Sequence, residues 1–281
     1  MICVSIDGAL VAPDAARISV FDRGLLYGDG CFEVLRTWDG VARDLDAHLD
    51  RLYDTARYLS LRTIERKHLV EAVYRTIAAT HADQPGPRGD QRIRIVLTRG
   101  PGAVSARLGE LGPGRSIVVV EPLPPQPGEI TLATVDFPVP RRGARGHKTL
   151  SYVEHLLARE LARVAGADEA VRLDGAGHVV EGATCNLFAV LRGAVATPPI
   201  ERGALPGIVR ARVLHLCAAE GILASVRDLA PRDLRSADEL FVTSSLRGVV
   251  PVTVLDGVLC KTGPVTPRLA HAYSVAMRTI S

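Results

Sequence analysis

A cluster of prolines near the middle of the chain sets the first limit on its fold. The stretch "EPLPPQPGEI", residues 121–130, contains four prolines and a glycine. Proline lacks a backbone donor and its ring blocks a continuing helix, so neither a helix nor a sheet runs through this stretch. We therefore expect an N-terminal domain over residues 1–121, a linker over 122–130 and a C-terminal domain over 131–281.

Composition excludes several classes of protein. Of the 281 residues, 47% are hydrophobic and 23% are charged, which predicts folded cores in both parts. The net charge of +3 is spread along the chain and forms no basic stripe of the kind that binds nucleic acid. The N-terminus lacks the pattern of a signal peptide, and the apolar runs are too short to cross a bilayer.

The five cysteines are widely spaced and form no CxxC pair. This pattern argues against a disulfide scaffold and against a structural zinc site. We therefore expect a cytoplasmic protein with reduced thiols, no metal and no membrane partner.

Apolar spacing predicts an α+β fold. In the first part, strands are expected around Asp-Gly turns at residues 7–8 and 39–40, and helices near 46–59 and 69–77. Two further strands, "RIRIVLTRG" and "SIVVVEPL", precede the linker. The second part reads as short strands, with a hairpin that turns at Asp256-Gly257. Its helices are expected over 152–166, after "LPGIV" and from about residue 264. Val153, Leu156, Leu157, Leu161 and Val164 lie on one face of the helix over 152–166.

Lys148, in "HKTLSY", lies between a strand-like segment and a helix. Such a loop is open to ligands while the sheet holds it in place. A lysine whose amine is partly desolvated can form a Schiff base, although a solvated lysine at a helix start is the ordinary alternative.

Four other stretches carry groups that bind anions or ring nitrogens. Glu181 ends a strand in "VVEGATCNLF" and is followed by Asn186. In "LPGIV", the first-turn amides of Ile208 and Val209 point toward an anion. Arg51, in an amphipathic helix, and the hydroxyls of "FVTSS" are further phosphate donors, although Arg51 could instead pair on the surface with a carboxylate such as Asp54. Together with the lysine amine, these groups match what pyridoxal 5'-phosphate requires.

Read in order, these stretches resemble the fold-type IV pyridoxal-phosphate enzymes, which include branched-chain aminotransferases, D-amino-acid aminotransferases and aminodeoxychorismate lyases. The matching stretches run from "DRGLLYGDGCFEVLR" through "LDAHLDRL", "HKTLSYVEHLLA", "EGATCNLF" and "LPGIVR" to "VVPVTVLDG". The resemblance implies a small N-terminal α/β domain, a larger C-terminal domain with a mostly antiparallel barrel-like sheet, and a homodimer.

The resemblance also assigns roles to single residues. Lys148 resembles the Schiff-base lysine and Glu181 the carboxylate at the pyridine nitrogen. Phosphate ligands are implied at Arg51, Ile208, Val209 and Ser245. Tyr152 resembles a tyrosine that binds the phenolic oxygen of the cofactor, and Tyr27 an aromatic residue near the active site.

The resemblance implies an aminotransferase that moves an amino group between an amino acid and a 2-oxo acid. The four-residue step from Lys148 to Tyr152 favours D-amino acids over branched-chain L-amino acids. The resemblance leaves several arginines as candidates for binding the substrate carboxylate. Arg94, with Arg92 on the same face of its strand, lies near the arginine of branched-chain enzymes. Arg107 lies in the loop used by D-amino-acid enzymes.

The sequence also bears on two other arginines and on two functions other than an aminotransferase. Arg247 departs from the small residues common at its turn and is a further candidate ligand of the substrate carboxylate, whereas Arg99 is expected to be a surface charge. Aminodeoxychorismate lyase, which forms 4-aminobenzoate and pyruvate, is the alternative activity. A non-catalytic binding protein with the same fold is disfavoured by the set of Lys148, Glu181 and Arg51.

Overall fold

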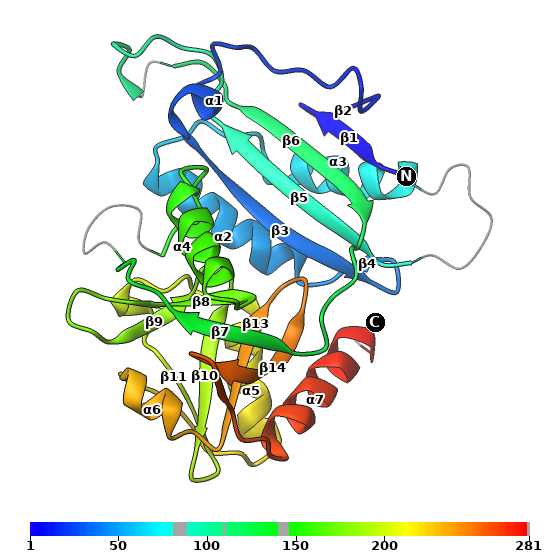
Figure 1. Ribbon diagram of the computed structural model, residues 1–281. Helices are drawn as coiled ribbons and strands as arrows, with labels where there is room; N and C mark the ends of the chain where they lie inside the picture. Colours follow the sequence, from blue (N-terminus) through cyan, green and yellow to red (C-terminus); the bar gives the residue numbers. More distant parts are fainter. Residues whose placement is uncertain (81–88, 109–110, 140–145, 280–281) are drawn as a thin grey trace. The chain divides into compact units, whose positions relative to one another are not determined.

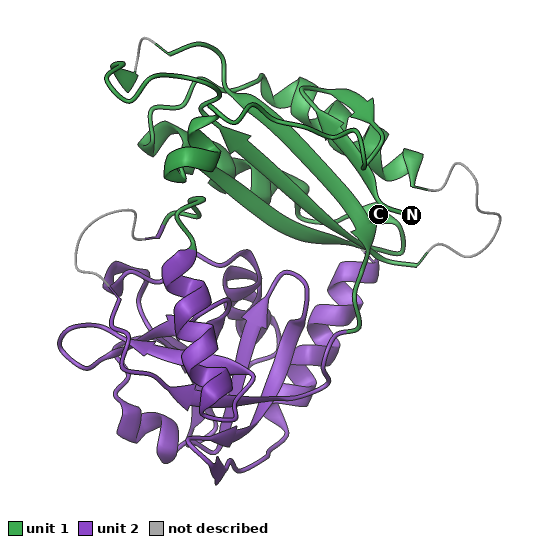
Figure 2. Cartoon of the chain, turned by 45° about the horizontal axis from the view of Figure 1, so that its top comes forward, with its two compact units in different colours: residues 1–125, 147–152 green, residues 126–146, 153–281 purple. Residues whose placement is uncertain are grey.

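The computed structural model describes residues 1–80, 89–108, 111–139 and 146–279. The described residues form two compact units (Figure 2). Unit 1 contains Met1–Pro125 together with His147–Tyr152, and unit 2 contains Gln126–Gly146 and Val153–Ser281. The chain thus leaves unit 1, returns to it for six residues and leaves it again. The segment that returns carries Lys148, so this lysine belongs to unit 1. The expected domains over 1–121 and 131–281, joined by a linker over 122–130, stay a prediction.

Unit 1 is built on one antiparallel sheet in the order β2-β1-β6-β5-β3-β4 (Figure 1). Its strands are β1 (Cys3–Ile6), β2 (Ala9–Val11), β3 (Gly30–Trp38), β4 (Val41–Ala42), β5 (Gln91–Thr98) and β6 (Arg115–Pro122). Its helices are α1 (Arg23–Tyr27), α2 (Leu45–Tyr58) and α3 (Arg66–Ala79). Helices α2 and α3 pack on the sheet.

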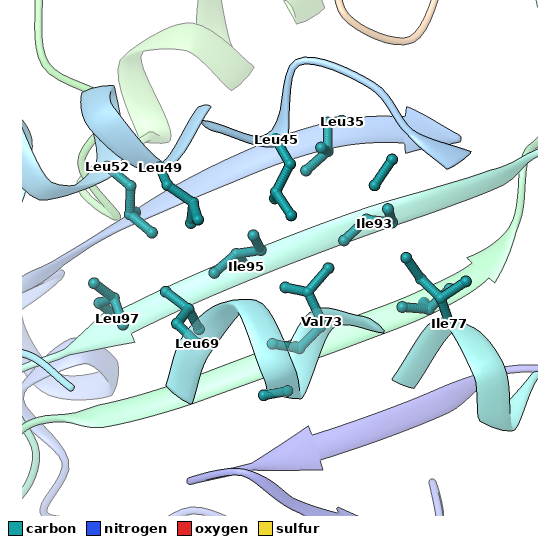
Figure 3. Packing of buried hydrophobic residues seen from close by; sticks show 14 of the residues in the cluster. Leu35, Leu45, Leu49, Leu52, Leu69, Val73, Ile77, Ile93, Ile95 and Leu97 are labelled. Atoms are coloured by element: carbon teal, nitrogen blue, oxygen red, sulfur yellow. The ribbon is translucent and has the colours of Figure 1, made fainter. Parts of the chain in front are cut away.

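The hydrophobic core of unit 1 lies between these two helices and the sheet (Figure 3). Ile93, Ile95 and Leu97 alternate along β5 and point into this core, as a period of two requires. Leu49 and Leu52 of α2 reach the same core. The arginines between the buried β5 residues therefore lie on the opposite face of the sheet.

Hairpins join the strands where the sequence predicted them. Asp7-Gly8, Asp39-Gly40 and Asp256-Gly257 all have positive φ at both residues, from +50° to +84°. Two residues with positive φ define the turn that matches the twist of paired strands, and glycine and aspartate tolerate that conformation. The predicted Asp-Gly turns are confirmed.

Unit 2 is built on a nine-stranded sheet in the order β12-β11-β10-β13-β14-β7-β8-β9, with β15 paired to β14. The strands are β7 (Ile130–Thr134), β8 (Glu169–Leu173), β9 (Val179–Gly182), β10 (Asn186–Leu191), β11 (Ala194–Thr197), β12 (Ala224–Val226), β13 (Glu239–Ser244), β14 (Gly248–Leu255) and β15 (Val258–Leu259). Three pairings are parallel, β11–β12, β7–β14 and β7–β8, and the others are antiparallel. Strand β9 also contacts β10, so the sheet curls back on itself like a barrel.

The helices of unit 2 are α4 (Val153–Val164), α5 (Ile208–Ala219), α6 (Pro231–Arg235) and α7 (Val265–Thr279), with a short 3-10 turn at Ile200–Arg202. Helices α5 and α7 pack on each other and on β13, and α7 also covers β14. No helix in the described ranges is long and apolar enough to cross a membrane.

The apolar stripe of α4 faces away from the sheet. The buried residues of α4 are Ala158 and Ala162, which let the helix approach β8 closely. The larger residues stay exposed, from 44% at Leu161 to 74% at Val164. The pattern predicted an apolar face correctly, but that face is not part of the core of unit 2.

Candidate active site

The segment with Lys148 is held against the start of β3. Phe32 N donates to Lys148 O at 3.0 Å, and Leu150 N donates to Gly30 O at 2.9 Å. Between them, Cys31 and Thr149 form an antiparallel bridge. These bonds fix the backbone on both sides of the lysine.

Two glycines make this close approach possible. A Cβ at Gly30 would lie 2.4 Å from Leu97 O and 2.7 Å from Leu150 Cδ1. A Cβ at Gly28, which has φ +65°, would lie 2.6 Å from Ser151 Oγ. A larger residue at either glycine of "YGDG" would therefore push the lysine segment off β3.

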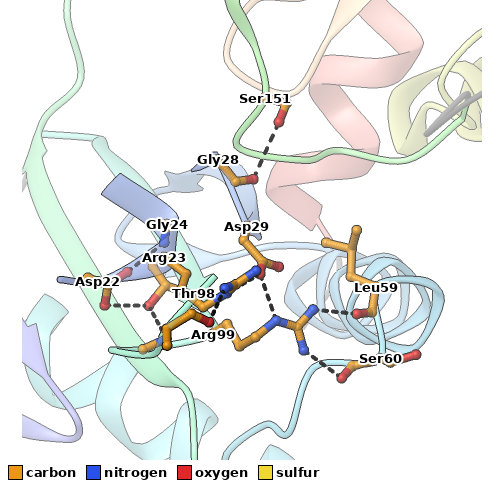
Figure 4. A network of polar contacts seen from close by, with 12 residues as sticks. Asp22, Arg23, Gly24, Gly28, Asp29, Leu59, Ser60, Thr98, Arg99 and Ser151 are labelled. Carbon is orange, nitrogen blue, oxygen red and sulfur yellow. Dashed lines mark hydrogen bonds and ion pairs between the residues drawn. The ribbon is translucent and has the colours of Figure 1, made fainter. Parts of the chain in front are cut away.

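A polar network supports the loop that contains these glycines (Figure 4). Asp29 Oδ2 accepts from Arg23 Nε at 2.9 Å and from Arg99 Nε at 2.7 Å. Arg99 also donates to the carbonyls of Leu59 and Ser60 at the end of α2. Burial raises the pKa of Asp29, but the hydrogen bonds and charges of the two arginines outweigh it and lower that pKa overall.

Arg99 is therefore not a surface charge. It is only 3% exposed, and its contacts tie the loop after α1 to the end of α2. The expectation of a surface position for Arg99 is wrong because the sequence gives no sign of its partners, which lie far from it along the chain. Tyr27 lies at the end of the braced helix α1, exposed, with the Arg23 guanidinium 5.0 Å from the centre of its ring.

The amine of Lys148 lies against two aromatic rings. Its Nζ is 4.7 Å from the ring centre of Phe32 and 5.3 Å from that of Tyr152, and the two rings meet edge to face at 5.1 Å. The Arg94 guanidinium also lies over the Phe32 ring, at 4.3 Å. Burial and the charge of Arg92 lower the pKa of Arg94. Unit 1 thus brings Lys148, Tyr152 and Arg94 into one cluster, around a phenylalanine that sequence reasoning missed.

The other two arginines of this region have separate positions. Arg92 pairs with Glu121 on the neighbouring strand β6. Arg107 is exposed in the loop after β5. Of the arginines on and after β5, the structure therefore places Arg94 in the cluster with Lys148.

Arg51, on α2, forms a bidentate ion pair with Glu33 of β3. Arg51 Nε and Nη2 donate to the two carboxylate oxygens at 2.7 and 2.8 Å, and His48 Nδ1 lies 2.7 Å from Oε2 of Glu33. Burial raises the pKa of Glu33, yet the charge and hydrogen bonds of Arg51 outweigh it and lower the pKa to about 2. Burial also lowers the pKa of His48. The surface alternative for Arg51 does not hold, because its guanidinium pairs with the buried Glu33 while Asp54 pairs with Arg57.

Unit 2 assembles a second group of predicted residues. Glu181 of β9 is buried, and its Oε2 accepts from Asn186 Nδ2 at 3.3 Å and from Leu205 N at 2.9 Å. Asn186 Nδ2 also donates to Leu205 O at 2.9 Å. The carboxylate is thereby held in one orientation, which suits a partner for a protonated ring nitrogen.

The amino end of α5 adjoins this group. Gly207 caps α5, and a Cβ there would lie 1.8 Å from Asn186 Oδ1, so glycine is required for Asn186 to reach Glu181. Ile208 and Val209 follow as the first helical residues, whose amides have no acceptor within the helix. A glycine-lined helix start beside a fixed carboxylate is a cradle that fits an anionic heterocycle such as pyridoxal 5'-phosphate.

The turn with Ser245 lies at the same end of the sheet. Asn186, the first residue of β10, is paired with Thr243 of β13, and Ser245 is two residues further on. In this turn Arg247 Nη1 is 3.9 Å from Oε2 of Glu169. Glu169 is fully buried and accepts from the amide of Ala183 at 2.9 Å. Glu169 was not predicted, since its role depends on strand pairing that no local pattern reveals.

Comparisons with known proteins agree with these features. Residues 30–255 match the family described as amino-transferase class IV. A Methanocaldococcus jannaschii protein, provisionally named a branched-chain-amino-acid aminotransferase, is 36% identical over 96% of this chain and 94% of its own length. The D-alanine aminotransferase of Bacillus licheniformis is 26% identical over 99% of this chain and 96% of its own length.

Solved structures show the same architecture. The branched-chain aminotransferase of the archaeon Thermoproteus uzoniensis, crystallised with norvaline, superposes with a TM-score of 0.89 at 29% identity. The match covers 98% of this chain and 94% of that chain. Another branched-chain amino acid aminotransferase, complexed with N-(5'-phosphopyridoxyl)-L-glutamate, superposes with a TM-score of 0.88 at 28% identity, over 98% of this chain and 93% of its own.

Proposed function

Because this chain belongs to the class IV aminotransferases, we propose that it transfers amino groups from branched-chain L-amino acids to 2-oxo acids, with Lys148 carrying the cofactor. Membership of the family confirms the expected enzyme class, the fold-type IV architecture and the use of pyridoxal 5'-phosphate. The substrate class and the role of each residue are our proposals.

Each residue has a task that follows from its contacts. The amine of Lys148 would hold the cofactor through its aldehyde. Once displaced by the substrate amine, it would take the proton from the substrate α-carbon and deliver it to the former aldehyde carbon of the cofactor. Glu181, held by Asn186 and Leu205 N, keeps a proton on the ring nitrogen. Arg51, Ser245 and the first-turn amides of α5 bind the phosphate. The bound cofactor supplies an electron-poor ring that accepts the electrons of the broken C–H bond.

The position of Arg94 is the observation that supports branched-chain substrates. It is the arginine that shares the Phe32 ring with Lys148, and its position in the sequence resembles that of the substrate arginine of branched-chain enzymes. Arg107, at the position that suggests D-amino acids, lies exposed in its loop. D-amino acids stay the second candidate, because the short step from Lys148 to Tyr152 and the D-alanine aminotransferase relative favour them.

Half-reactions test the proposal. Purified protein loaded with pyridoxal 5'-phosphate is mixed with L-leucine, L-glutamate or D-alanine, and the absorbance of the cofactor is followed. We expect L-leucine and L-glutamate to convert it. Arg94→Met should lower kcat/KM about 10- to 100-fold, the worth of one charged hydrogen bond, while the control Arg107→Met stays within about twofold.

Other outcomes contradict the proposal in distinct ways. Conversion by D-alanine alone would favour the second candidate. Formation of pyruvate and 4-aminobenzoate from aminodeoxychorismate would indicate a lyase. If borohydride fixes the cofactor to the Lys148→Ala variant as well as to the original protein, Lys148 does not carry the cofactor.

We also propose that the enzyme is a homodimer. Both units expose large apolar side chains, among them Phe21, Leu25 and Leu26 around α1 and the stripe of α4. Exposed apolar patches of this kind mark protein interfaces more often than free surface. We expect Leu157→Glu to shift the protein from dimer to monomer in analytical ultracentrifugation. A monomer before the substitution would contradict the proposal.

A further inference from the structure

His147 precedes Lys148 and faces the opposite way. Its imidazole stacks on the Tyr58 ring, with centres 4.1 Å apart and planes 15° apart. Its Nδ1 lies 3.4 Å from Thr55 Oγ1. Successive side chains of an extended segment alternate, so His147 contacts α2 while the amine of Lys148 lies against the Phe32 ring.

The two contacts of His147 lie on the face of α2 that carries Arg51. Residues four and seven positions apart share one side of a helix, so Arg51, Thr55 and Tyr58 form a single row. At 1.5 Å per residue, the row from Arg51 to Tyr58 is about 10 Å long. The ring of His147 is thus fastened to the same rigid helix that presents Arg51.

A second connection joins the same two cations. The carbonyl of Lys148 is bonded to the amide of Phe32, and the next residue, Glu33, holds the Arg51 guanidinium. Lys148 and Arg51 are therefore linked once through β3 and once through His147 and α2. With the connection through β3 alone, the lysine segment could pivot about its hydrogen bonds to β3. The second connection, through His147, prevents this and fixes the distance between Lys148 and Arg51.

We propose that His147 is a positioning residue that fixes the spacing between the Lys148 amine and the Arg51 guanidinium. This inference rests on the proposed function, in which the amine takes an aldehyde and the guanidinium a phosphate on the same rigid ring. A ligand with both groups is bound tightly only when the two cations are correctly spaced. A ligand that has the aldehyde and lacks the phosphate does not sense this spacing.

The stack on Tyr58 involves a neutral imidazole. Burial lowers the pKa of His147, and the charge of Asp54 raises it by less. Burial therefore favours the uncharged form of the ring, which adds no positive charge beside Lys148. Its contribution is the fit between two flat rings, which another flat side chain can reproduce.

The experiment compares two ligands on three variants. The affinities of pyridoxal 5'-phosphate and of pyridoxal, which has no phosphate, are measured by absorbance titration of the cofactor-free full chain. We expect His147→Ala to lower the affinity for pyridoxal 5'-phosphate about tenfold, which is a usual coupling between neighbouring residues. The affinity for pyridoxal should change by less than about twofold. His147→Phe keeps a flat ring and should restore most of the loss. His68→Ala, at an exposed histidine of α3, is the control and should change neither affinity.

A cycle with Tyr58 completes the test. Tyr58→Ala should reproduce the loss of His147→Ala, and the double variant should be no weaker than either single one. The inference is wrong if His147→Ala leaves the ratio of the two affinities unchanged, or if His147→Phe loses as much as His147→Ala. Failure of the original protein to bind pyridoxal 5'-phosphate would instead contradict the proposed function.

Discussion

Replacing Glu33 with glutamine should cost unit 1 about 3 kcal/mol of folding free energy. Glu33 is completely buried, and the ion pair with Arg51 and the contact with His48 lower its pKa from 4.5 to about 2. At about 1.36 kcal/mol for each pH unit between these two values, the lowering corresponds to roughly 3 kcal/mol. The same size, about 3–5 kcal/mol, is typical when one partner of a buried ion pair is removed.

The sign of the pH dependence follows from the lowered pKa. A carboxylate with a lowered pKa stabilises the fold above its unfolded pKa of 4.5, and this stability is lost as the pH falls toward 2. The free-energy difference between the original protein and Glu33→Gln should therefore be largest near pH 6 and should shrink steadily below pH 4.5.

Trp38 allows this difference to be measured in unit 1. It is the only tryptophan, it is 7% exposed, and it lies on β3 with Glu33. Urea unfolding of the cofactor-free protein is followed by its fluorescence at pH 6 and at pH 3. Asp50→Asn on α2 is the control, because its pair with Arg66 is exposed and should contribute less than about 1 kcal/mol. The reasoning would be refuted if Glu33→Gln lowered the free energy of unfolding by less than about 1 kcal/mol at pH 6. It would also be refuted if the loss of free energy at pH 3 were as large as the loss at pH 6.

Two further predictions concern Gly207 and the cysteines. Gly207→Ala places a Cβ 1.8 Å from Asn186 Oδ1. It should lower the affinity for pyridoxal 5'-phosphate about tenfold, because about that factor corresponds to one hydrogen bond to a charged group. Absorbance titration measures this affinity. Gly128→Ala, with nothing within 4 Å, should leave that affinity unchanged, and equal affinities would contradict the role of Gly207. A thiol reagent should label only Cys3 and Cys260 in the native protein, because burial protects the other thiols; labelling of all five before unfolding would contradict this.

Local patterns were sufficient for the elements of the fold. The Asp-Gly pairs fixed three hairpins, and the alternation in "RIRIVLT" placed the arginines of β5 on one face and its isoleucines on the other. For α4, the pattern predicted an apolar face correctly but not its direction. Periodicity reports that a helix has an apolar side, and the fit of Ala158 and Ala162 on the sheet decides which side is buried.

The site was predictable only where motifs are local. Lys148, Glu181 and Asn186 stand in short stretches whose residue types match their chemistry. Phe32 carries no such signal, because its role arises when β3 pairs with a segment more than a hundred residues away. Glu33 carries none either, because its contacts with His48 and Arg51 depend on how α2 packs on β3. Arg99 was misread for the same reason, since its carboxylate and carbonyl partners come from two other parts of the chain.

The return of residues 147–152 to unit 1 has a consequence for how the protein can be divided. A fragment that stops at the proline-rich linker would lack the segment that is bonded to Gly30 and Phe32, and the amine of Lys148 would remain on the other piece. Neither half alone would hold both Arg51 and Lys148, so splitting the gene there separates the two cations. During synthesis, the first unit is likewise incomplete until the ribosome has passed Tyr152.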